Sequence, residues 1–239
     1  MACITIDEPV VEKVAALVAA ASGSADLELE VRMGSIRNGK FSPGVSRPQI
    51  DNIIQALDKT STAVHCLQTC GQWDEVEDFY YAHEGRRLRT RVQFDPNVMT
   101  MTSVTIEKTR IDSVLIRSHS HDLRVSLSRE TPVSVLPHSV KTELVRIKQL
   151  KQFAIDGSPF RIDCSTVWHG PVRSAAEVMQ TTSDGVFEVE LEFLQTNVNT
   201  EKYTGPPEKV TRRLARSILF KAADLMMSPK VHMQLETTN

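Results

Sequence analysis

Apolar residues recur with helical spacing in three segments of the chain. The first predicted helix follows an N-cap at Asp7 and ends near Gly23, and the second opens with the capping box Ser46-Arg47-Pro48-Gln49. The third follows Gly205-Pro206-Pro207 and stops before Pro229. Their apolar sides consist, in chain order, of Val10, Val11, Val14, Leu17 and Val18; Ile50, Ile53, Ile54 and Leu57; and Val210, Leu214, Ile218 and Leu225.

Between the second and third helices the apolar period changes to two, which predicts β-strands joined by turns rich in Gly, Pro, Asp, Asn and Ser. A further strand precedes the second helix. The segment 169–184 has a weak helical pattern or is a loop. The predicted strands cover about residues 27–34, 63–69, 75–82, 86–94, 102–108, 111–117, 122–128, 143–155, 160–167 and 186–194.

Polar and charged side chains share one face of these strands, and apolar side chains share the other. The polar face holds Arg87, Arg89 and Arg91; Arg124, Ser126, Ser128 and Glu130; Arg146 and Lys148; and Arg161, Asp163 and Ser165. A polar face ordinarily meets bulk water. Three amphipathic helices, however, need an apolar sheet surface to pack on, and about eight antiparallel strands remove their edges by closing into a barrel.

These patterns predict a mainly β fold of the α+β kind: an eight-stranded antiparallel closed barrel, a tunnel, with helices packed on the outside and charges inside. The barrel is expected over about residues 27–194, within one domain that spans residues 1–239. A membrane barrel has the same alternation, but it leaves the three helices unexplained and would need a signal peptide.

Two strands carry ladders of glutamates, Glu28 and Glu30 on the first and Glu188, Glu190 and Glu192 on the last. Neighbouring carboxylates on one face lie about 7 Å apart and repel by roughly 2 kcal/mol per pair at an effective dielectric of about 20. A cation must therefore neutralise the repulsion between these carboxylates. Carboxylate oxygens are the preferred ligands of hard divalent ions, so the ladders predict a Mg²⁺ or Mn²⁺ site.

Composition narrows the possible partners. The chain of 239 residues is 41% hydrophobic with a net charge of −2 and no block of basic residues, so neither DNA nor a membrane is an expected partner. We expect a soluble intracellular protein, because no signal segment or long apolar run is visible. Cys66 and Cys70 beside His65 lack a second pair at zinc spacing, and His119 and His121 are expected to be solvated.

A tunnel with carboxylates on one wall and Arg and Lys on the others suits a compact polyanion such as a triphosphate. The basic groups would neutralise charge on the phosphate oxygens during an in-line attack by water. Glu130 stands alone among basic and hydroxyl neighbours on its strand, so it is the best placed carboxylate to orient or deprotonate that water.

The ordered motifs resemble those of the metal-dependent RNA 5′-triphosphatases of fungi, protozoa and large DNA viruses, within the triphosphate tunnel metalloenzyme superfamily. The resemblance covers about residues 27–194. It rests on Glu28-Leu-Glu30-Val-Arg32-Met-Gly34, Asp78-Phe-Tyr-Tyr, Arg91-Val-Gln-Phe-Asp95, Ile106-Glu-Lys108, Arg124-Val-Ser-Leu-Ser-Arg-Glu130, Arg146-Ile-Lys148, Arg161-Ile-Asp163-Cys-Ser165 and Glu188-Val-Glu190-Leu-Glu192.

The resemblance implies removal of the γ-phosphate from triphosphate-ended RNA, the first step of mRNA capping, and hydrolysis of nucleoside triphosphates with manganese. It also implies a nuclear location and a separate guanylyltransferase partner. Glu28, Glu30 and Glu192 would bind the metal, and Glu188 and Glu190 would hold metal-bound water and neighbouring basic groups. Arg91 and Lys148 would bind the γ-phosphate, and Glu130 would position water. The supporting tunnel residues would be Lys108, Arg124, Arg146, Asp78, Asp163 and Ser165.

One position departs from the family pattern R-x-K-x-R, because Leu150 stands where a basic residue is expected. Either a bulge turns Lys151 inward or another arginine, such as Arg89, supplies the cation. Two rivals stay open: a tripolyphosphatase or thiamine triphosphatase of the same superfamily, whose first motif is E-x-E-x-K where this chain has Arg32, and a non-catalytic module that binds 5′-triphosphate ends. The second rival has no use for five strand glutamates.

Overall fold

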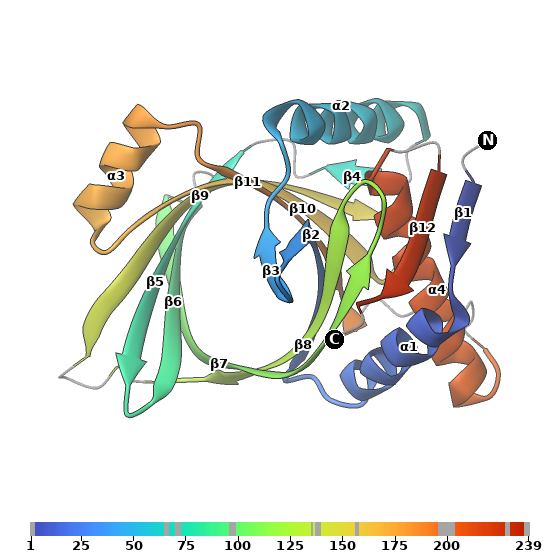
Figure 1. Ribbon diagram of the computed structural model, residues 1–239. Coiled ribbons are helices and arrows are strands. Elements are labelled where there is room, and N and C mark those ends of the chain that lie inside the picture. Colours follow the sequence, from blue (N-terminus) through green and yellow to red (C-terminus); the bar gives the residue numbers. More distant parts are fainter. Residues whose placement is uncertain are drawn as a thin grey trace.

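A closed β-barrel with helices on its outer surface forms the body of the computed structural model (Figure 1). The structure describes residues 3–64, 67–69, 73–95, 99–134, 136, 140–155, 158–195, 204–227 and 230–236. The barrel strands are β2 (Leu27–Arg37), β5 (Asp74–His83), β6 (Arg86–Asp95), β7 (Thr100–Arg117), β8 (Asp122–Pro132), β9 (Lys141–Ile155), β10 (Phe160–Gly170) and β11 (Val186–Phe193).

These eight strands pair in the closed order β2-β8-β7-β6-β5-β9-β10-β11-β2, and every pairing is antiparallel. The closure confirms the predicted eight-stranded tunnel. Because no barrel strand keeps a free edge, the backbone hydrogen bonds are satisfied around the whole circumference, and alternate side chains must point inward.

The outer face of the barrel is apolar where helices cover it. The helices α1 (Glu8–Ser22) and α4 (Pro207–Leu225) pack against each other beside β2, β7 and β8, α2 (Arg47–Val64) lies over β11, and α3 (Arg173–Thr182) lies over β9 and β10 (Figure 1). The core between helices and sheet buries alternate strand residues such as Val31, Leu127 and Leu191 completely or nearly so. The hydrophobic effect therefore holds one face of each strand outward against the helices, and this leaves the polar face for the interior.

Four short strands extend the barrel sheet: β1 (Cys3–Ile6), β3 (Lys40–Pro43), β4 (Leu67–Thr69) and β12 (Lys230–Leu235). The strand β12 pairs with β7 and with β1, so the two ends of the described chain lie side by side. The hairpin of β2 and β3 turns at Asn38 and Gly39, whose φ values of 50° and 68° fit a tight turn. No helix in the described ranges is long and apolar enough to cross a membrane.

Several sequence-based boundaries were wrong. Residues 102–108 and 111–117 belong to the single strand β7, in which a bulge between Arg110 and Asp112 shifts the register. The helix α2 continues to Val64, so the predicted strand 63–69 shrinks to Leu67–Thr69. His65, Cys66 and Cys70 lie outside the described residues.

The predicted caps of the first two helices are absent. The Asp7 side chain makes no cap hydrogen bond and instead lies 2.9 Å from Nε2 of His232. The Gln49 side chain does not return to the helix backbone, because its amide is 3.0 Å from Nδ1 of His121. His121 is therefore half-buried rather than solvated, and burial lowers its pKa. His119 is exposed, as expected.

Substituting Gly34 by alanine tests the close approach of β3 to β2. An added Cβ would collide with the backbone oxygen of Ser42 and would lie 2.7 Å from the ring of Phe41. Backbone cannot yield as a flexible side chain does, so Gly34→Ala is expected to lower the free energy of unfolding by about 1–3 kcal/mol in urea denaturation. Gly23→Ala is the control, since its neighbours lie at 3.5 and 3.8 Å. Equal stability of the two variants would contradict the packing argument.

Candidate active site

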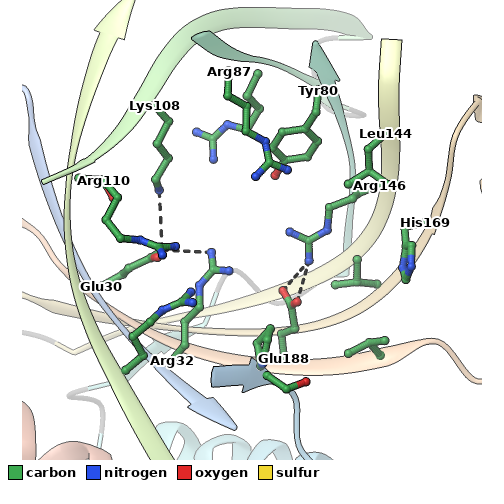
Figure 2. A pocket seen from close by; sticks show the side chains of 17 residues that line it. Glu30, Arg32, Tyr80, Arg87, Lys108, Arg110, Leu144, Arg146, His169 and Glu188 are labelled. Atoms are coloured by element: carbon green, nitrogen blue, oxygen red, sulfur yellow. Dashed lines mark hydrogen bonds and ion pairs between the residues drawn. The ribbon is translucent and has the colours of Figure 1, made fainter. Parts of the chain in front are cut away.

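The barrel interior is lined by charged side chains of both signs, and Figure 2 shows arginines and a lysine facing Glu30 and Glu188. It holds two adjoining cavities, one of about 620 Å³ and one of about 40 Å³. Five residues line both cavities and join them: Glu30, Arg32, Tyr80, Arg89 and Lys108. We call the larger space the outer cavity and the smaller one the inner cavity.

The predicted metal ligands lie together on the wall of the inner cavity. Glu30 of β2 and Glu192 of β11 are direct partners in register, and Glu28 lies two residues along the same face of β2. Directly paired residues place their Cβ atoms about 5 Å apart, close enough for both carboxylates to reach one ion. Lys108 contacts Glu28 and lies 3.8 Å from Glu30, while Arg161 contacts Glu192.

The charge on this wall is only partly neutralised. Burial raises the pKa of Glu192 to about 7, and Asp163, Glu28 and Glu190 add to that increase although Arg161 opposes it. A carboxyl group with a raised pKa has too little positive charge nearby to stabilise its ionised form.

The donor set fits a hard divalent ion, because it consists of carboxylate oxygens that face one small polar space. Within the described residues, no three His, Cys, Asp or Glu side chains yet converge in ligating geometry. Lys108 and Arg161 occupy the carboxylate oxygens that would have to turn towards an ion.

A second cluster faces this wall and is built around a fully buried carboxylate. Asp78 of β5 accepts two hydrogen bonds from Arg91 of β6, at 2.8 and 3.1 Å, and lies 3.3 Å from Nζ of Lys148 on β9. Burial alone would raise the pKa of Asp78, but Lys148 and Arg91 outweigh it and hold that pKa well below its usual value. Asp78 thus fixes the two predicted γ-phosphate ligands next to each other.

Glu130 of β8 lies beside two cations. Its Oε1 is 3.2 Å from Arg89 and 3.3 Å from Lys108. Since Lys108 also contacts Glu28, Glu130 is joined to the carboxylate wall through one ammonium group. This places the predicted water-positioning carboxylate next to the predicted metal ligands.

The remaining glutamates of β11 hold arginines in place. Both oxygens of Glu188 accept from Arg146 at 2.7 Å, and Glu190 lies 2.9 Å from Arg32. Burial opposes the charged form of Glu190, yet Arg32 and the other cations keep its pKa below the usual value. Both glutamates therefore bind neighbouring basic groups.

The other predicted site residues also face the interior. Asp163 accepts two hydrogen bonds from Arg161 and two from Gln152, and Ser165 is buried on the wall of the inner cavity. Arg124 lines the outer cavity. Every residue proposed from the sequence for the site therefore lies on the inward face of its strand or in a contact with one that does.

Lys151 does not replace the missing cation at Leu150. The pairing of β9 with β10 runs without a shift through Leu150 and Lys151, so no bulge turns Lys151 inward. Its ammonium instead bonds to Asp58 of α2 at 2.8 Å, outside the barrel, while Leu150 lines the inner cavity. Of the two alternatives the bulge is wrong, and Arg89 stays the candidate, joined by Arg161.

Sequence reasoning assigned no site role to several residues that line the cavities, among them Tyr80, Arg87, Arg110 and Arg161. Their strand parity was the available signal, since Arg87 and Arg161 share a face with assigned residues. Tyr80 is uncharged, and it interacts with Arg146 and lies under the Arg87 guanidinium at 4.6 Å. Arg110 has the parity of Lys108, but it lies between the two strands predicted at 102–108 and 111–117, which form the single strand β7.

The fold and its charged interior define a triphosphate tunnel. The S. pombe RNA triphosphatase Pct1, solved in complex with the Spt5 CTD, has the same fold, with a TM-score of 0.67 at 15% identity over 90% of this chain and 93% of that chain. The Mimivirus capping enzyme triphosphatase matches with a TM-score of 0.62 at 14% identity over 93% of this chain and 99% of that one. Comparison with curated protein sequences gives no match.

The sequence family described as "mRNA capping enzyme, beta chain" matches residues 35–216, which is most of the chain, and the chain belongs to this family. The protein is therefore a hydrolase of the capping pathway that acts on the 5′-triphosphate of RNA. This membership separates it from the tripolyphosphatase and the non-catalytic module that the motifs alone left open.

Replacing Asp78 by asparagine tests the buried cluster. The change leaves Lys148, which is 6% exposed, without its carboxylate, and breaking a buried pair costs about 3 kcal/mol or more. Because the folded pKa of Asp78 is depressed, its stabilisation is present above the unfolded value near 3.8 and is lost as the pH falls below it. Denaturant unfolding from pH 7 to acid is expected to show lower stability of Asp78→Asn and a flatter acid limb.

The matched control is Asp224→Asn on the exposed side of α4, which is expected to stay within about 0.5 kcal/mol of the unchanged protein. If Asp78→Asn is as stable as Asp224→Asn at pH 7, the buried pair does not contribute as described.

Proposed function

We propose that this chain removes the γ-phosphate from the 5′-triphosphate end of RNA in a reaction that depends on bound Mn²⁺ or Mg²⁺. The observation that carries the proposal is the register pairing of Glu30 with Glu192, with Glu28 beside them, across the inner cavity from Arg91 and Lys148. Few sites other than those for a metal and a polyphosphate require both signs of charge at this density.

Glu28, Glu30 and Glu192 would hold the ion. When bound, it would polarise a phosphate oxygen and neutralise charge as the transition state forms. Burial raises the pKa of Glu192 to about 7, and a cation bound at the wall would favour its ionised form.

Arg91 and Lys148 would bind the γ-phosphate oxygens. Asp78 holds both groups, which fixes their positions before the substrate arrives and limits the entropy lost on binding. Their charges would stabilise the negative charge on the transferred phosphoryl group. Arg161 and Arg89 add cations on the side where Leu150 supplies none.

Glu130 would orient the attacking water and accept its proton. It lies 3.2 Å from Arg89 and 3.3 Å from Lys108, and these two contacts fix its position in the tunnel. Arg32 and Arg146 are held by Glu190 and Glu188, so they stay extended into the tunnel where the other two phosphates of the substrate would lie.

The capping role implies that the product, an RNA with a 5′-diphosphate, passes to a separate guanylyltransferase, and that the protein works in the nucleus. Pct1 has been solved with the Spt5 CTD, so protein partners exist for a protein of this fold. Hydrolysis of free nucleoside triphosphates with manganese is part of the same proposal, because the inner site contacts only the triphosphate.

Substitution of the wall glutamates tests the metal role. Glu28→Ala and Glu192→Ala are expected to lower γ-phosphate release by about 100-fold or more, because the ion supplies several kcal/mol to the transition state. Both variants should also bind Mn²⁺ more weakly in calorimetric titration while they keep the circular dichroism of the unchanged protein. The control Glu75→Ala removes an exposed glutamate from β5 and should retain activity. Normal hydrolysis by both wall variants would show that the metal assignment is wrong.

Comparison of substrates tests the reaction. Release of phosphate from triphosphate-ended RNA, ATP and tripolyphosphate is measured with Mg²⁺ and with Mn²⁺. RNA should be hydrolysed with either ion, and ATP with Mn²⁺. Hydrolysis of tripolyphosphate alone would contradict an RNA enzyme, and tight binding of RNA without turnover would contradict catalysis.

A further inference from the structure

Three arginines of the outer cavity have no carboxylate partner within the described residues. They are Arg87 of β6, Arg110 of β7 and Arg124 of β8. The cations that line the inner cavity differ, since each is ion-paired to an acidic side chain: Arg32, Arg89, Arg91, Lys108, Lys148 and Arg161. Arg146 of the outer cavity is likewise paired, to Glu188. The interior thus passes from balanced charge in the inner cavity to an excess of positive charge in the outer one.

Two of these arginines rest on aromatic rings. The guanidinium of Arg87 lies 4.6 Å from the ring centre of Tyr80, and that of Arg124 lies 4.8 Å from the ring centre of Phe41 on β3. Stacking of this kind orients a guanidinium without using its N–H groups as donors to an acid. The donors therefore stay available for a ligand that enters the cavity.

The surroundings of Arg124 indicate what that ligand is. Burial lowers the pKa of Arg124, and the neighbouring positive charges of Arg110 and Arg32 lower it further. Its Nε is buried and has no hydrogen-bond partner. Positive groups that crowd one another, with an unpaired donor among them, are satisfied by an anion.

The sizes of the two cavities set the direction of the substrate. The inner cavity of about 40 Å³ has room for little more than an ion or a phosphate oxygen, whereas the outer cavity of about 620 Å³ lies in the range of sites that hold a whole small molecule. With the γ-phosphate at Arg91 and Lys148, and Arg32 and Arg146 next along the tunnel, the nucleoside and the chain beyond it extend into the outer cavity.

We propose that Arg87, Arg110 and Arg124 bind the backbone phosphates of the first nucleotides of the RNA, and so favour a polynucleotide over a free triphosphate. The proposal rests on the triphosphatase function above and adds a substrate subsite to it. Contacts to phosphates fix the position of the chain without reading its bases, so the subsite accepts any 5′ sequence.

Kinetics of Arg87→Ala, Arg110→Ala and the double variant test the subsite. Each substitution is expected to raise KM for triphosphate-ended RNA about tenfold, because a charge-assisted hydrogen bond is lost, and to leave kcat unchanged. Hydrolysis of tripolyphosphate should stay within about twofold of the unchanged protein. Arg213→Ala, on the exposed side of α4, removes the same charge outside the tunnel and should alter neither substrate.

Salt dependence provides a readout that a structural role would not change. The slope of log KM for RNA against log salt concentration should fall by about 0.7 for each phosphate contact removed. Arg87→Lys should restore part of the slope, because a lysine still neutralises a phosphate.

The results separate the two proposals. If the unchanged protein hydrolyses no triphosphate, the proposed function fails. If it hydrolyses RNA but the arginine variants keep the KM and the slope of the unchanged protein, the subsite is overturned alone. An equal loss on RNA and tripolyphosphate would also overturn it, since it would place these arginines on the triphosphate itself.

Discussion

Neutralisation of buried charge is the constraint on which this structure depends. Closure of the barrel removes strand edges and encloses a polar face that would otherwise meet water, so each enclosed carboxylate needs a cation nearby. The pairs Asp78 with Lys148 and Glu188 with Arg146 meet this need across neighbouring or nearby strands. Stability and function thus depend on the same contacts, because the cations that neutralise the enclosed carboxylates are also those that would bind phosphate.

Much of the fold could be predicted because two periodicities agree. A period of two with charge on one face, beside three helices that need an apolar surface, determines which face points inward. The structure confirms this from β2 to β11. The pairing of β1 with β12 could not be predicted, because no turn connects the two strands and neither carries an alternating charge pattern. Ile4 and Val231 become neighbours only in the folded chain. The domain extent of residues 1–239 stays a prediction.

The site could be predicted as far as strand parity and family motifs reach. The inward position of Glu192 follows from its parity, but its contact with Arg161 depends on the register between β10 and β11, which no local pattern fixes. Leu150 shows the same limit. The sequence left open whether Lys151 replaces the cation missing at Leu150. The salt bridge from Lys151 to Asp58 of helix α2 shows that it does not. The metal, the roles of the individual residues and the nuclear location stay predictions.

Lys108 links the carboxylate wall to Glu130, the carboxylate proposed to orient water. Its ammonium contacts Glu28 and lies near Glu30 and Glu130, so it neutralises the wall while it holds the residue proposed to orient water. Burial opposes its charge, but Glu30 and Glu28 raise its pKa above the usual value, so it stays charged. A divalent ion held by Glu28 and Glu30 would compete with Lys108 for these carboxylates, and the ammonium would then be available to a phosphate oxygen of the substrate. Binding at the wall and binding of the polyanion are therefore expected to strengthen each other through a single lysine.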